Sequence, residues 1–146
     1  MSVVVWGSQA SRDQAQADSF EAATTKQDFF REVDVLSLHL RLNDVTRGCV
    51  TAHDLSLMKP NSLLVNISRA ELVEPMALYH ELREVPTKTA AIDVFDCEPV
   101  TTDSEPLLSL TNVTATPHLG YVEQNSYELY FDIALDNILS YQRGGI

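Results

Sequence analysis

Three polar side chains of this sequence follow apolar runs at the point where each run ends. They are Arg69, Glu98 and His118, and a fourth, Asp93, lies inside the run that precedes Glu98. An arginine binds anions, a histidine gains or loses a proton near neutral pH, and a carboxylate can orient and charge that histidine. Taken singly, each is more often an ordinary surface or loop residue. Together they predict a proton-transfer site for an anionic substrate.

The apolar runs have the length and composition of buried parallel strands. They are short, rich in Val, Leu and Ile, and separated by segments long enough for a helix, which is the pattern of an α/β domain with a parallel sheet. The carboxyl ends of parallel strands lie along one edge, where open α/β sheets bind ligands. We expect about five strands, at Val3–Trp6, Val33–Leu40, Leu63–Ile67, Thr89–Phe95 and Asn112–Thr116.

Capping residues and helical periodicity predict the intervening helices. Thr25 and Thr51 each precede an aspartate by three residues, as N-caps do, and Pro75 stands where a first-turn proline belongs. In the two later helices the apolar stripes are Met76, Tyr79, Leu82, Val85 and then Tyr130, Ile133, Ala134, Asn137, Ile138, Tyr141. The predicted helical segments are 8–24 (a short helix or an irregular turn), 25–31, 51–59, 75–85 and 122–141, the last ending before Gly144-Gly145.

Composition narrows the function further. The chain has 146 residues and a formal charge of −11, which disfavours nucleic acid and anionic lipid as partners. Cys49 and Cys97 form neither a disulfide framework nor a metal-ligand spacing, so we expect reduced thiols, no metal and a cytoplasmic protein. No signal peptide or membrane span is predicted. The whole chain is expected to form one domain, residues 1–146.

Seven segments in order make the sequence resemble the D-isomer-specific 2-hydroxyacid dehydrogenase family, in the C-terminal part of its NAD(P)-binding domain. The ordered set extends over nearly the whole chain, although no single segment is decisive. The segments are Val3–Gly7 (VVVWG), Asp34–Leu40 (DVLSLHL), Thr46–Gly48 (TRG), Met58–Pro60 (MKP), Leu64–Ala70 (LVNISRA), Asp93–Pro99 (DVFDCEP) and Thr116–Tyr121 (TPHLGY).

The resemblance implies a hydride transfer between a nicotinamide and a 2-hydroxy or 2-keto acid. Arg69 would bind the substrate's carboxylate and carbonyl, His118 would take the hydroxyl proton, and Glu98 would hold and polarise His118. Asp93 would meet the nicotinamide carboxamide. The other cofactor contacts that the resemblance implies lie at the nicotinamide end (Ile67, Ser68, Gly120) and elsewhere along the ligand edge (Ser8, His39).

Two departures from the family pattern change the expectations. The glycines, at 7, 48, 120, 144 and 145, do not give the phosphate loop G-x-G-x-x-G, so we expect an incomplete Rossmann-like three-layer domain without the first strand, phosphate loop, first helix and substrate domain. The segment after Trp6 lacks an acidic residue, and Ser8, Ser11 and Arg12 could accept a 2′-phosphate, which favours NADP over NAD. Cofactor binding without the phosphate loop is itself in question.

Three readings therefore stay open. The chain is the nicotinamide-side half of a dehydrogenase, inactive by itself; or a non-catalytic oligomeric or interaction module; or the product of a truncated or mis-started gene. The lost strand would leave open edges on Val3–Trp6 and Leu63–Ile67. Either these two strands pair directly or another copy covers them, and we expect a homo-oligomer, most simply a dimer. The particular hydroxy acid cannot be predicted, since the residues that select it belong to the absent domain.

Overall fold

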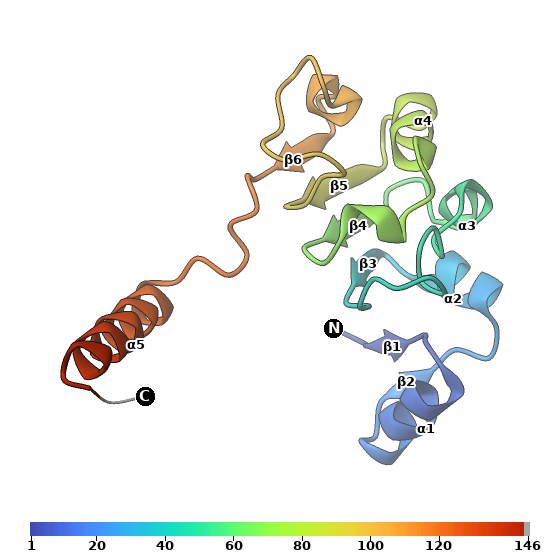
Figure 1. Cartoon of the computed structure of the whole chain (residues 1–146). Coiled ribbons are helices and arrows are strands. Elements are labelled where there is room, and N and C mark those ends of the chain that lie inside the picture. Colours follow the sequence, from blue (N-terminus) through green and yellow to red (C-terminus); the bar gives the residue numbers. More distant parts are fainter. Residues whose placement is uncertain (145–146) are drawn as a thin grey trace.

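The computed structural model describes residues 1–144 as an α/β domain with a separate C-terminal helix (Figure 1). The six strands are β1 (Val4–Val5), β2 (Glu21–Ala22), β3 (Val35–Leu38), β4 (Leu63–Asn66), β5 (Thr89–Ile92) and β6 (Val113–Ala115). The helices are α1 (Gln9–Ala17), α2 (Lys26–Glu32), α3 (Ala52–Leu57), α4 (Ala77–Glu84) and α5 (Gln124–Gln142), with 3₁₀ turns η1 (Ala70–Leu72) and η2 (Pro106–Ser109).

Four strands form one parallel sheet in the order β3-β4-β5-β6. The register pairs Leu36 with Leu64, Leu64 with Ala90 and Ala90 with Val113, so each strand lies beside its successor in the sequence. The predicted α/β class and parallel strands are confirmed. Because all four strands run the same way, the segments that follow β4, β5 and β6 leave the sheet at one edge.

A second, two-stranded parallel sheet joins β1 to β2. The predicted first strand is confirmed as β1, and of the two alternatives for residues 8–24 the helix is correct, as α1. The sequence reading missed β2, because a two-residue strand within FEAATT carries no recognisable apolar run. The amide of Ala23 donates to the carbonyl of Val5 at 3.0 Å and extends this pairing.

The prediction of open edges on two strands is correct for one strand and wrong for the other. The structure pairs β4 on both sides, with β3 and with β5, so the prediction that Leu63–Ile67 would have an open edge is wrong. Among the described residues the break in hydrogen bonding falls instead between β1 and β3. The reason is the order of the strands. Because each strand of the four-stranded sheet pairs with the next strand in the sequence, β3 is the terminal strand and exposes its unpaired backbone groups.

Burial along the sheet differs between its two faces. Alternate residues such as Leu36, Leu64 and Ala90 are buried, whereas their neighbours on the other face are half-buried or exposed, and Val35 is 53 % exposed. Helices α2, α3 and α4 lie on one side of the strands in Figure 1. Of the three layers expected, the described residues therefore form two. The second sheet face lies open, which is unusual because parallel sheets are normally covered on both faces.

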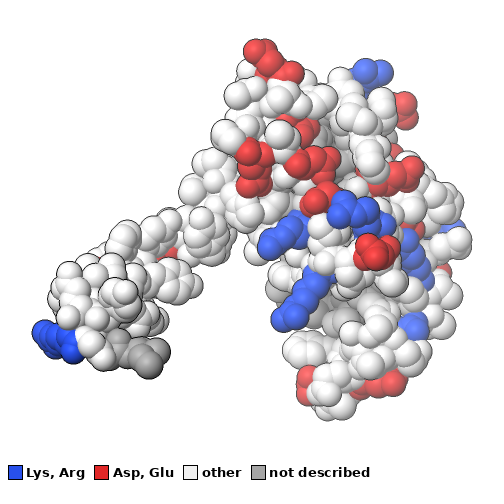
Figure 2. Space-filling model, viewed as in Figure 1, with Lys and Arg blue, Asp and Glu red and all other residues white. Residues whose placement is uncertain are grey.

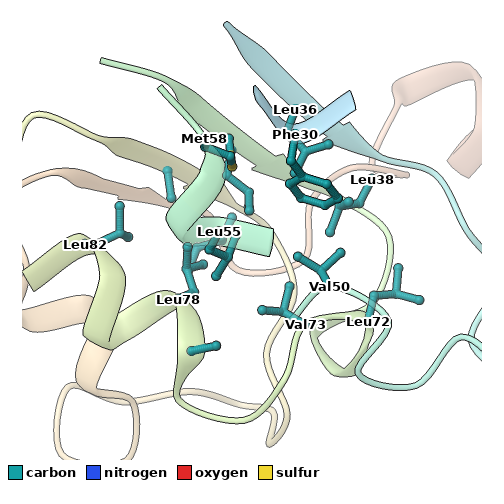
Figure 3. Close-up of a cluster of buried hydrophobic side chains, with 14 of the residues drawn as sticks. Phe30, Leu36, Leu38, Val50, Leu55, Met58, Leu72, Val73, Leu78 and Leu82 are labelled. Carbon is teal, nitrogen blue, oxygen red and sulfur yellow. The ribbon is translucent and has the colours of Figure 1, made fainter. Parts of the chain in front are cut away.

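The hydrophobic core lies between the sheet and these helices (Figure 3). Phe30 of α2, Leu55 of α3 and Leu82 of α4 are each at most 2 % exposed and meet the buried side chains of β3 and β4. The segments that lead into and out of the β4 edge add Val50, Leu72 and Val73 to the same cluster. This core fixes the strand ends that carry the candidate site.

Helix starts follow the predicted caps in two cases. The Thr25 hydroxyl caps α2 through the amide of Asp28, and Thr51 and Asp54 form a complete capping box on α3. The prediction for α4 is wrong in detail. Its N-cap is Met76, in the left-handed conformation with φ 62°, and Pro75 lies outside the helix. Its buried residues are Ala77, Leu78 and Leu82, of which only Leu82 belongs to the predicted stripe.

Helix α5 is confirmed, but it packs differently from the other helices. It stands away from the domain at the end of an extended segment (Figure 1), and its 19 residues include no buried side chain. Gly144, with φ 80°, follows its C-cap Arg143, while Gly145 lies outside the described residues. Within residues 1–144 no helix combines the length and apolar character needed to cross a membrane.

Candidate active site

Asn66 shapes the turn that presents Arg69 after β4. Its side-chain amide donates to the Arg69 carbonyl at 2.9 Å, and its oxygen accepts from the Ser68 amide at 3.0 Å. The Ser68 hydroxyl in turn donates to the carbonyl of Leu40 at 2.8 Å, which ties this turn to the segment that follows β3. Arg69 is exposed, and its guanidinium donates to the Ser68 carbonyl at 2.6 Å. The turn thus leaves a cation at the sheet edge.

Glu98 and His118 meet across the neighbouring strand ends. The Nδ1 atom of His118 lies 2.9 Å from Oε2 of Glu98, and Oε1 of Glu98 accepts from the Phe95 amide at 3.1 Å. An ionised carboxylate can only accept hydrogen bonds, so Nδ1 carries the proton and Nε2 of a neutral imidazole has a free lone pair. The bond from His118, followed by that from Phe95, holds the pKa of Glu98 below its ordinary value.

Asp93 anchors the loop that carries His118. The carboxylate is 3 % exposed; Oδ1 accepts from the Thr116 hydroxyl and from the Leu119 amide (2.7 Å), and Oδ2 accepts from the Gly120 amide (2.7 Å). Burial would raise the pKa of Asp93, but these three hydrogen bonds outweigh it and the pKa lies below its ordinary value. The residue predicted to meet the nicotinamide is thus already engaged with its own chain.

The remaining predicted contacts are spread along the same edge. Ile67 follows β4 and is 51 % exposed, and Gly120 lies so close to Asp93 that a Cβ would be 3.0 Å from Oδ2. His39 is exposed after β3, where its Nε2 lies 2.9 Å from the Ser37 hydroxyl. Leu119, which was not predicted, adds a second exposed apolar side chain (47 %) beside Gly120.

Ser8 and Arg12 lie apart from these residues, at the start of α1. The Ser8 hydroxyl caps the helix by accepting from the Ser11 amide at 3.2 Å. The guanidinium of Arg12 lies over the Trp6 ring, 4.5 Å from its centroid, and donates to Gln9 at 2.7 Å. Its Nε is buried without a hydrogen-bond partner in the described residues. A helix N-terminus with a stacked, incompletely paired arginine suits an anion.

The three proposed catalytic residues occupy an open edge. A hollow of about 210 Å³ lies nearby, between α4, η2 and the segment after β5, but its lining does not include Arg69, Glu98 or His118. Glu98 and His118 are each 36 % exposed at the side chain. A substrate held there would meet solvent unless another surface covered it.

Sequence reasoning missed some of the residues that build this site. Asn66 was not predicted as a site residue, although its side chain bonds to both sides of the turn before Arg69. Thr116 was treated as the end of a strand, yet its hydroxyl is bound to Asp93. A polar residue at the end of an apolar strand was the available signal for Asn66. For Thr116 no local pattern exists, since its partner lies 23 residues away.

A parallel α/β sheet with an arginine and a Glu–His pair at its carboxyl edge has the architecture of a dinucleotide-binding type of domain. Comparison with known proteins identifies the family. Residues 1–120 match the NAD binding domain of the D-isomer specific 2-hydroxyacid dehydrogenases, and the chain belongs to that family. The resemblance inferred from the sequence is thereby confirmed.

Individual relatives give the extent of the match. The chain is 30 % identical over 143 residues to a glyoxylate reductase of Aeropyrum pernix, and 41 % identical over 104 residues to the D-3-phosphoglycerate dehydrogenase of Escherichia coli K12. A solved phosphoglycerate oxidoreductase from Vibrio cholerae o395 is 54 % identical, with a TM-score of 0.92 over 99 % of this chain. The chain spans 42 %, 25 % and 46 % of these proteins respectively, which is less than half of each.

Proposed function

We propose that this chain provides the nicotinamide side of a site for hydride transfer between NAD(P) and a 2-hydroxy or 2-keto acid. The observation that carries the proposal is the pairing of Nδ1 of His118 with Glu98, because it leaves Nε2 as the base. Arg69, at the end of the adjoining strand β4, is the anion-binding partner. The relatives named above are, by their names, a reductase of glyoxylate and a dehydrogenase of D-3-phosphoglycerate. Both compounds are carboxylic acids, which agrees with a guanidinium at this edge.

In the oxidative direction, Nε2 of His118 accepts the proton of the substrate hydroxyl while the carbonyl forms at that carbon. Glu98 stabilises the imidazolium through Nδ1, and Arg69 binds the substrate carboxylate and the carbonyl oxygen. The cofactor, when bound, supplies the acceptor for the hydride that leaves the same carbon. In reduction the imidazolium returns the proton to the oxygen, so each direction conserves protons and electrons.

The residues present fit the two ends of a dinucleotide. At the nicotinamide end, the exposed apolar side chains of Ile67 and Leu119 would contact a flat ring, with Asp93, Ser68 and Gly120 beside them. Asp93 keeps acceptor capacity for a carboxamide, since a carboxylate has about four lone-pair sites and three are used. At the adenosine end of the dinucleotide, Ser8 and Arg12 favour the 2′-phosphate of NADP. In the sequence, His39 lies between these two residues and those of the nicotinamide end.

Cofactor binding tests this proposal directly. The melting temperature of the purified chain should rise with millimolar NADPH, and less with NADH. Adding glyoxylate should raise the melting temperature further in the wild type but not in Arg69→Ala. Arg47→Ala is the control, because Arg47 is also exposed and, among residues 1–144, forms an ion pair only with Glu71. Unchanged melting with both cofactors would favour the alternative, a non-catalytic module derived from this domain.

We also propose that two copies associate as a homodimer. The open edges of β1 and β3 and the uncovered sheet face around Val35 are surfaces that folded proteins rarely leave in water. The accessible surface is 9,948 Å², about a third more than expected for a folded monomer of 16.3 kDa. Helix α5 has no buried side chain, and its visible side is mostly uncharged in Figure 2.

A cytoplasmic location completes the proposal. Cys97 is an exposed free thiol and Cys49 is a half-buried one. Exposed thiols persist in reducing compartments. Burial raises the pKa of Cys49, so it is the less reactive of the two.

A further inference from the structure

We propose that Asp93 is the positioning residue for His118: its carboxylate holds the 116–120 loop in the one conformation that directs Nδ1 to Glu98. The proposal rests on the proposed function only in assigning proton transfer to His118. The arrangement itself can be measured in the chain without turnover.

His118 occupies a conformation that its own sequence does not favour. Its φ is 56°, in the left-handed region that side chains other than glycine rarely adopt. Such a conformation is unfavourable for a side chain other than glycine and persists only where the surroundings enforce it. Within the loop itself, the His118 amide donates to the Thr116 carbonyl at 3.0 Å. This short turn is too small to fix the direction of the side chain by itself.

Asp93 supplies the enforcing contacts on both sides of His118. The hydroxyl of Thr116 lies two residues before it, and the amides of Leu119 and Gly120 follow it directly; all three donate to the one carboxylate. Asp93 also lies one residue after β5, with its own amide bonded to the Asn66 carbonyl at 3.0 Å. The loop is thereby fastened to the middle of the sheet rather than to the surface.

Gly120 allows this carboxylate to approach. A Cβ at position 120 would lie 3.0 Å from Oδ2 of Asp93 and 4.0 Å from Cβ of Ile67. A side chain there would have to push the carboxylate away from the two amides. The requirement for glycine is therefore a close approach, since its φ is not in the positive region.

The groups that face His118 are few. Glu98 accepts from Nδ1, Asp93 holds the backbone, and the Tyr121 ring stands edge-on at 5.8 Å between centroids. The pair of Glu98 and His118 is 36 % exposed and would rotate freely without a fixed backbone. The position of Nε2, the atom that exchanges the proton, thus depends on the buried carboxylate behind it.

The test compares Asp93→Asn with Asp54→Asn and Glu98→Gln. Asp54 is a matched control, since it is 4 % exposed and also caps a backbone amide, but on α3, far along the chain from His118. Glu98→Gln removes the partner of Nδ1 and leaves Asp93 in place. The readouts are the ¹⁵N shifts of the His118 imidazole at alkaline pH and the hydrogen exchange of the Leu119 and Gly120 amides.

In the wild type and in Asp54→Asn, the shifts should report the tautomer with the proton on Nδ1. In Asp93→Asn they should move towards the mixture of free imidazole, as in Glu98→Gln, and exchange at Leu119 and Gly120 should accelerate at least tenfold. If Asp93→Asn does not fold, Thr116→Val tests the same carboxylate with one contact removed. Wild-type shifts and exchange in the folded variant would overturn the proposal, whatever is found for cofactor binding.

Discussion

The Nδ1 atom of His118 and the Oε2 atom of Glu98 lie 2.9 Å apart, although the two residues belong to loops that follow different strands. The register of β5 and β6, with Ile92 opposite Ala115, brings these loops together. Arg69 leaves the sheet one strand further along, after β4. The arginine, the glutamate and the histidine that pairs with it therefore follow three consecutive strands of one sheet.

The carboxyl of Glu98 should respond to the loss of His118. The bond from His118 is the main cause of its lowered pKa, so His118→Gln should raise that pKa towards the ordinary value of 4.5. Carboxyl ¹³C NMR as a function of pH measures the change. His80→Gln serves as the control, because His80 is an exposed residue of α4 whose ring meets the Tyr79 ring edge-on. An unshifted midpoint in His118→Gln would mean that the pair does not form in solution.

Stability should fall in acid, and Asp93 should account for part of the fall. The pKa of Asp93 in the folded chain lies below the value of about 3.8 for the unfolded chain. Ionised Asp93 therefore contributes fully to the free energy of unfolding above about pH 3.8, and this contribution is lost as the pH falls through the lower, folded pKa. Asp93→Asn should lower the free energy of unfolding at neutral pH by about 1–3 kcal/mol and flatten its dependence on pH below about 5. Urea unfolding between neutral and acidic pH tests both effects.

For this prediction Asp54→Asn is not a neutral control. The pKa of Asp54 is also lowered: burial opposes the shift, while bonds from Lys26 and Thr51 produce it. Each variant should therefore weaken the dependence of the free energy of unfolding on pH, and the double variant should weaken it more than either single variant. A slope that is unchanged in Asp93→Asn would show that its three hydrogen bonds are absent from the folded chain.

Arg12→Ala should distinguish the two cofactors. It removes the guanidinium over Trp6 that we assign to the 2′-phosphate, so the Kd for NADPH should rise about tenfold, equivalent to 1.4 kcal/mol, while that for NADH changes little. Isothermal titration measures both constants. Arg31→Ala is the matched control, an exposed arginine that pairs with Asp28 on α2. Equal weakening for both cofactors would argue against a 2′-phosphate at this position.

Helix α5 should contribute to association between copies. Phe131 and Ile138 are 63 % and 56 % exposed, so replacing both with serine should not destabilise the α/β domain, from which α5 stands apart. Sedimentation should show a dimer dissociation constant raised at least tenfold, as expected when buried apolar anchors are removed from an interface. Glu128→Gln, which changes a charged rather than an apolar side chain of the same helix, should have little effect. A wild-type chain that sediments as a monomer at micromolar concentration would contradict the proposed homodimer.

The sequence alone determined the features that depend on near neighbours. Apolar runs located β1 and β3 to β6, and the Thr25 and Thr51 caps located α2 and α3, because a cap and its amide are three residues apart. The ordered motifs also established the family, since residues 1–120 match its NAD binding domain. The site residues Arg69, Glu98 and His118 came from the same motifs.

Only the tertiary structure decided which strand edges are open, where α4 begins, and what Asp93 does. Each of these depends on segments distant in the chain: β4 is paired by β3 and β5, and Asp93 binds amides 26 and 27 residues away. Local propensity cannot report such pairings, because the free energy of a buried carboxylate depends on which donors surround it after folding. Asp93 could therefore be named from the sequence, but its hold on the His118 loop could not.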